Sequence, residues 1–122
     1  MTLALVATCF ACAAAAGGLF LAVCVLRRRR PPLAVAWGHP AAGLTALTLI
    51  YIAVTGWHGP RDLPLDAGAL VITFAFLGGG LLYALRATRL PRPFFVILIH
   101  ALAALAGCAL LIIGLVHGPG GA

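Results

Sequence analysis

The chain of 122 residues is 64% hydrophobic and only 8% charged, and its mean hydropathy is +1.17. A soluble domain usually has about a quarter of its residues charged, so the composition excludes an ordinary soluble fold and makes lipid part of the solvent. The net charge of +6 comes from arginines in short segments between apolar runs. Nucleic-acid binding needs a basic face interleaved with aromatic residues, and we therefore expect no nucleic-acid partner.

The first apolar run, about residues 3–26, is long enough to cross a bilayer as a tilted helix. It lacks the positively charged start of a secretory signal peptide, so we expect a membrane span. Cys9 and Cys12 form a C-x-x-C spacing inside this run. Because alanines surround them, we interpret them, with Cys24 and Cys108, as small residues at helix contacts rather than as a redox or zinc site.

The second predicted span covers about residues 33–57, and Pro40 lies inside it. Either the helix bends at Pro40 or it begins there. Residues 58–66 combine glycine, proline and charge and predict a loop. Two further spans are predicted at about residues 67–85 and 94–116. The fold predicted from the sequence is an all-α, polytopic membrane four-helix bundle in a single domain, residues 1–122.

The arginines predict how the bundle is oriented in the membrane. Seven of the eight flank the first and third connections, namely Arg27, Arg28, Arg29, Arg30, Arg86, Arg89 and Arg92. The opposite side has Arg61 beside Asp62 and Asp66. The positive-inside rule then places both termini on the non-cytoplasmic side, as in a multi-pass protein of a bacterial inner membrane. Anionic lipid is an expected partner of Arg27, Arg28, Arg29 and Arg30.

The two halves of the chain, residues 1–61 and 62–122, repeat weakly at an offset of 61 residues. The informative matches involve uncommon residue types and keep their order: Arg28 with Arg89, Pro32 with Pro93, and His39 with His100. Each half holds two spans, so the halves form a parallel 2+2 repeat about an axis along the membrane normal. A repeat of this kind predicts His39 and His100 at equal depth. The alternative is that two-helix segments of this composition resemble one another without duplication.

His39 and His100 are the residues that most suggest chemistry. Each stands near the start of a predicted span and is followed by small residues, which allow close approach of a helix or of a flat macrocycle. An imidazole in hydrocarbon needs a polar partner. Helical bundles build haem sites from such histidines on facing helices. A structural hydrogen bond to a neighbouring helix is the alternative.

The segments His-Pro-Ala-Ala-Gly-Leu-Thr-Ala-Leu and Ile-His-Ala-Leu-Ala-Ala-Leu-Ala-Gly, at His39 and His100, resemble the ligand helices of bacterial b561-type cytochromes and related quinol-linked b-type subunits. The resemblance covers two short patches. It implies that His39 and His100 are axial ligands of haem b, with haem iron as the only metal, and that the chain transfers electrons within the membrane. His58 and His117, at the far ends of the second and fourth spans, are candidate ligands of a second haem, or solvated interfacial residues.

Other activities have less support in the sequence. No acidic residue lies inside a predicted span, so the carboxylate of proton-coupled transporters is missing, and a narrow polar path would depend on Thr8, Thr45, Thr48 and Thr73. No catalytic triad or His-Glu-x-x-His motif is present. The alternative to a haem protein is a non-catalytic accessory subunit of a larger respiratory or photosynthetic membrane complex, or a homo-oligomer, without a cofactor of its own.

Overall fold

The computed structural model describes residues 2–56, 62–91 and 93–117. It contains four α-helices: α1 (Thr2–Leu26), α2 (Leu33–Thr55), α3 (Leu63–Ala87) and α4 (Phe94–His117). All four are long and apolar enough to cross a membrane. No strand occurs in the described residues. The predicted all-α membrane four-helix bundle is thus confirmed, and the chain is a multi-pass membrane protein by fold.

The start of α3 differs from the prediction, and the start of α2 decides between the two predicted alternatives. The third helix begins at Leu63, inside the predicted loop, because the Asp62 side chain caps it by accepting a hydrogen bond from the Leu65 N–H, and because Pro64 suits a first helical turn. Asp66 therefore lies in the first turn of α3. The second helix runs through Pro40 from Leu33, so it does not begin at Pro40.

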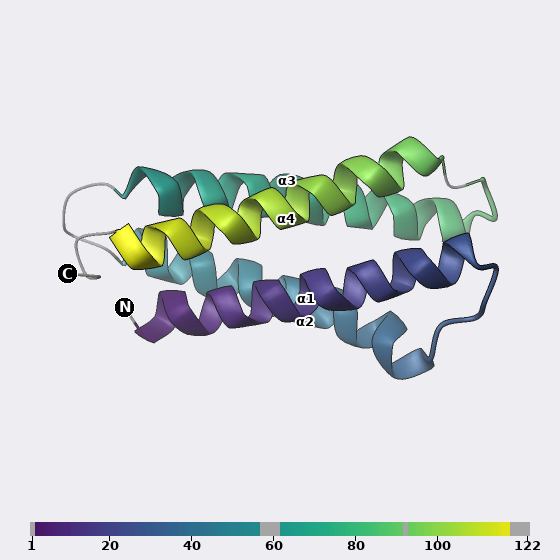
Figure 1. The fold of residues 1–122 in the computed structure, drawn as a ribbon, viewed down its shortest axis with the longest axis horizontal. Helices are drawn as coiled ribbons and strands as arrows, with labels where there is room; N and C mark the ends of the chain where they lie inside the picture. Colours follow the sequence, from purple (N-terminus) through teal and green to yellow (C-terminus); the bar gives the residue numbers. More distant parts are fainter. Residues whose placement is uncertain (1, 57–61, 92, 118–122) are drawn as a thin grey trace.

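The helices form two antiparallel hairpins (Figure 1). In each hairpin the two helices lie side by side, α1 against α2 and α3 against α4. The hairpins then meet through α1 with α4 and α2 with α3. We call the end where α1 and α3 terminate the arginine end, since Arg27 to Arg30, Arg86 and Arg89 lie there. The opposite end, where Asp62 and Asp66 begin α3, is the aspartate end.

The helix ends at the arginine end repeat the same backbone turn in both hairpins. Arg28 and Arg89 have the left-handed φ values of 54° and 57°. The next residue bonds back to the helix in each case, from Arg29 N–H to the Cys24 carbonyl at 2.8 Å and from Leu90 N–H to the Leu85 carbonyl at 2.9 Å. These bonds satisfy the last helical carbonyls, as in a Schellman motif. The two turns lie 61 residues apart, at the offset found in the sequence.

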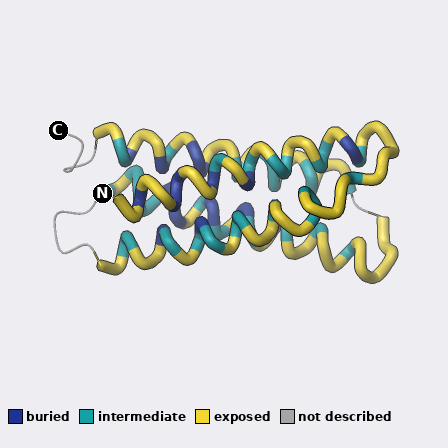
Figure 2. Tube along the Cα trace, turned by 90° about the horizontal axis from the view of Figure 1, so that it is seen from below, coloured by how far each residue is buried: buried dark blue, intermediate teal, exposed yellow. Residues whose placement is uncertain are grey.

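The packed core lies toward the aspartate end, and the half near the arginine end is looser (Figure 2). Small residues and a few branched ones make up this core: Ala7, Ala11, Ala46, Ile50, Ala69, Ile72, Cys108 and Leu111. From Leu33 to Thr45 in α2 and from Phe94 to Ala106 in α4, by contrast, every residue is partly or fully exposed. The bundle therefore combines one tightly closed half with one open half.

Gly114 sets the close approach of α3 and α4, which gives a first prediction. A Cβ at this position would lie 3.1 to 3.3 Å from the backbone N, the Cβ and the Cα of Leu65. Since backbone cannot move aside without separating the helices, Gly114→Ala should destabilise the bundle by about 1–3 kcal/mol. Denaturant unfolding in detergent measures this loss. In the control Gly43→Ala, the added carbon meets only Phe76 at 3.8 Å, and equal losses in the two variants would contradict the packing of α3 on α4.

Candidate functional site

His39 of α2 lies against α1 and is held there by a backbone hydrogen bond. Its Nδ1 is 2.8 Å from the carbonyl oxygen of Ala14. A carbonyl oxygen only accepts hydrogen bonds, so Nδ1 carries the proton and donates it. The Nε2 of the neutral ring is left with a free lone pair. The bond also satisfies an imidazole that would otherwise be unpaired about 9 Å along the helix from Leu33.

His100 of α4 repeats this arrangement against α3. Its Nδ1 is 2.7 Å from the carbonyl oxygen of Ala75. Each carbonyl lies 25 residues before its histidine in the chain, and each histidine stands at the same distance from the start of its helix. Both imidazoles thus have the same protonated nitrogen, the same kind of partner and an available Nε2.

Glycines make room for the two rings. A Cβ at Gly18 would lie 2.9 Å from Cε1 of His39, and one at Gly79 would lie 3.0 Å from Cε1 of His100. In an α-helix the carbonyl of residue i also accepts from the N–H of residue i+4, so Gly18 and Gly79 share the Ala14 and Ala75 carbonyls with the imidazoles. A side chain at either glycine would therefore occupy the space through which the ring reaches its acceptor.

The two histidines come together between the hairpins. Their ring centroids are 6.0 Å apart, and the ring planes are nearly perpendicular at 83°. Both rings are part-buried. They stand where the tight core gives way to the open half. Of the four histidines considered in the sequence, the structure brings together His39 and His100.

His117 does not join this pair. His117 is the last residue of α4, exposed, with Nδ1 3.3 Å from the Ile113 carbonyl of its own helix. At 1.5 Å per residue it lies about 25 Å along α4 from His100. His58 lies outside the described residues. The second-haem prediction at His58 and His117 consequently stays a prediction.

The cysteines and threonines pack within and between helices. Cys108 belongs to the buried core and Cys12 packs against that core, whereas Cys9 of the C-x-x-C is exposed. The threonines considered for a polar path each donate to a carbonyl of their own helix: Thr8 to Ala4, Thr45 to Ala41, Thr48 to Leu44 and Thr73 to Ala69. Each hydroxyl proton is therefore used within its own helix, and Thr73 Oγ1 also lies 3.0 Å from the hydroxyl of Tyr51 in α2.

Sequence reasoning did not identify the groups that orient the two rings. Ala14 and Ala75 act through their backbone carbonyls, so their side chains carry no signal. Gly18 and Gly79 lie in long apolar runs, where a glycine is equally typical of an ordinary helix contact. The repeat contained the signal, because these residues match one another at the same offset as the two histidines.

The fold and the site together define a small multi-pass membrane protein with a pair of oriented histidines between two helical hairpins. No protein-family model, curated protein or solved structure matches the chain.

Proposed function

We propose that the chain is a small b-type cytochrome in which His39 and His100 hold one haem b, and that it carries electrons within the membrane. The observation that carries this proposal is the pairing of two imidazoles, each oriented by its own backbone carbonyl and each with a free Nε2. Metal-binding histidines typically donate their second ring N–H to such an acceptor, which fixes the tautomer and the ring orientation.

The number of ligands favours haem over a bare metal ion. Structural zinc sites need four protein ligands. Among the described residues, no group of three or more histidine, cysteine or acidic side chains is gathered. Haem iron receives its equatorial ligands from the macrocycle, so two axial histidines complete its coordination. A two-histidine site thus suits haem better than it suits zinc.

The spacing of the rings also supports the proposal. Metal–imidazole bonds of about 2.0 Å on opposite sides of one ion place two ring centroids roughly 6 Å apart, close to the 6.0 Å between His39 and His100. The same distance suits an edge-to-face aromatic contact, which is the packing alternative. The open half of the bundle beside the rings has few buried side chains and suits a flat macrocycle better than the closed half does.

Orientation and partners follow from the charges. With the arginine end in the cytoplasm, the histidine pair lies nearer the cytoplasmic surface, and both termini face the other side. A bacterial inner membrane is the corresponding location. Bound haem supplies a one-electron carrier. The chain's residues position it, and an electron donor on the cytoplasmic side would reach it through the arginine end.

An absorption spectrum of the purified protein tests the proposal. The full chain is produced in cells supplied with haem precursor and purified in a mild detergent. We expect a Soret band, and one haem per chain in a pyridine haemochrome assay. Because both axial positions are filled by histidine, the reduced protein should not shift its spectrum under carbon monoxide. Folded but colourless protein would reject the haem proposal and leave the accessory-subunit alternative.

A further inference from the structure

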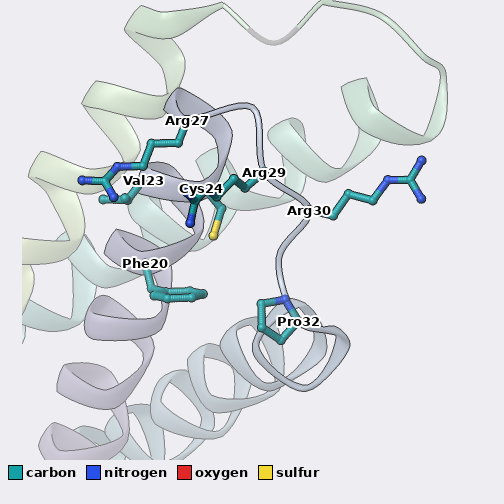
Figure 3. A pocket seen from close by; sticks show the side chains of 7 residues that line it. All are labelled: Phe20, Val23, Cys24, Arg27, Arg29, Arg30 and Pro32. Atoms are coloured by element: carbon teal, nitrogen blue, oxygen red, sulfur yellow. The ribbon is translucent and has the colours of Figure 1, made fainter.

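The arginine end of the first hairpin contains a cavity of about 260 Å³ with a mixed lining. Three of its residues are cationic, Arg27, Arg29 and Arg30. The rest are largely apolar and come from α1 and from the segment before α2, namely Phe20, Val23, Cys24 and Pro32. Figure 3 shows these side chains around the end of α1, with Arg30 directed away from Arg27. Cationic and apolar side chains therefore line the same cavity at the end of a membrane-spanning helix.

No described residue places a counter-charge beside the three guanidinium groups. Within the described part of the chain, none of them makes a hydrogen bond or ion pair with another described residue. The sequence has only two acidic residues, Asp62 and Asp66, and both lie at the opposite end of the bundle (Figure 1). The carbonyls that end α1 already accept from backbone N–H groups, so they do not need these side chains. Since the described residues supply no anion to the cluster, an anion from outside them is needed to neutralise it.

The second hairpin shows that the arginines of the cavity are not a general feature of the fold. At the offset of 61 residues, Arg27, Arg29 and Arg30 correspond to Thr88, Leu90 and Pro91. The shared arginine, Arg28 with Arg89, forms the left-handed turn and does not line the cavity. The cationic lining thus occurs in the first hairpin alone.

We propose that this cavity is a binding site for one anionic phospholipid of the surrounding bilayer. The end of a membrane-spanning helix lies at the level of the lipid headgroups. Guanidinium groups bind phosphate oxygens through paired hydrogen bonds, and Phe20 and Val23 offer apolar surface to the first part of an acyl chain. A phosphodiester joined to an acyl chain matches both parts of the lining, whereas a free phosphate matches only one.

Lipid binding to purified protein tests the proposal. Native mass spectrometry in detergent compares the retention of phosphatidylglycerol with that of phosphatidylcholine by the wild-type chain. We expect one phosphatidylglycerol to be retained preferentially. In the variant R27Q/R29Q its affinity should fall roughly twenty-five-fold, because each arginine near an anionic headgroup contributes a factor of about five.

The control R86Q/R89Q removes the same charge from the same end of the bundle but leaves the cavity intact. We expect its affinity to change by less than a factor of about two at this site. Similar losses in the two variants would reduce the proposal to general charge attraction and overturn it. Equal retention of both lipids by the wild type, or displacement of phosphatidylglycerol by equimolar inorganic phosphate, would overturn it as well.

Circular dichroism checks that each variant folds. If R27Q/R29Q does not fold, the preference of the wild-type chain for phosphatidylglycerol over phosphatidylcholine tests the proposal. The single variant Arg29→Lys is a more conservative test, since it keeps the positive charge but loses the planar guanidinium with its paired hydrogen-bond donors. Weaker retention of phosphatidylglycerol by Arg29→Lys supports direct contact with the phosphate, and unchanged retention contradicts it.

Discussion

Replacing His100 with alanine is expected to remove haem from the protein. In the proposed site the His100 imidazole is one of the two side chains that would hold the haem iron, and its loss would leave His39 to hold the cofactor alone. Losing even an outer-shell partner of a metal ligand lowers affinity about 10–100-fold, so losing the ligand itself should lower it by at least a hundredfold. The measurement is the pyridine haemochrome content of protein purified from matched cultures. Any residual haem should bind carbon monoxide at the vacated axial position.

Two companion variants make this result specific. His39→Ala should give the same loss, because the two sites are built alike. His117→Ala removes an exposed imidazole at the other end of α4 and should leave in place the haem held by His39 and His100. Full haem content in His100→Ala would reject His100 as a ligand, whatever the source of the colour.

Gly79→Ala is the second change with a large expected effect. The added carbon would lie 3.0 Å from Cε1 and 3.6 Å from Nδ1 of His100, while the ring is fixed by its bond to the Ala75 carbonyl. The ring must rotate or withdraw, and either movement weakens that bond. We expect haem affinity to fall about 10–100-fold, as for loss of an outer-shell partner. A haem titration of the purified apoprotein measures the change.

The neighbouring residue provides a matched control. A carbon added at Gly80 has no heavy atom within 4 Å, so Gly80→Ala should bind haem like the wild type and gain up to about 1 kcal/mol in helix stability. The two variants differ only in which face of α3 receives a methyl group. Equal binding by both would show that the His100 ring does not rest on Gly79.

The sequence predicted the helices well because the signals for them are local. Long apolar runs bounded by arginine, proline and glycine define the first and fourth helices to within a residue or two. The predicted start of the third helix, residue 67, was wrong by four residues, because α3 begins at Leu63. An aspartate and a proline close together are typical both of a loop and of a capped helix start. The course of α2 through Pro40 could not be settled either, because that outcome depends on packing rather than on the proline itself.

The pairing of His39 with His100 was predicted from the repeat, and in the structure the centroids of the two rings are 6.0 Å apart. The means of orienting them was beyond sequence reasoning. Backbone carbonyls are present at every residue, and only the packing of α2 on α1 and of α4 on α3 selects Ala14 and Ala75. The arginine-lined cavity could not be predicted from the sequence either, because the approach of Phe20 and Pro32 to the arginines depends on tertiary structure.

Each hairpin carries a histidine, the carbonyl that orients it and the glycine that admits it. Two separate copies of one such hairpin would therefore assemble a symmetric dimer with the same pair of facing imidazoles. Such a dimer would dissociate on dilution, and the pair of imidazoles would be lost with it. Joining two copies in one chain makes assembly independent of concentration. It also removes the need for two identical hairpins, and in this chain only the first hairpin has the arginines that line the cavity.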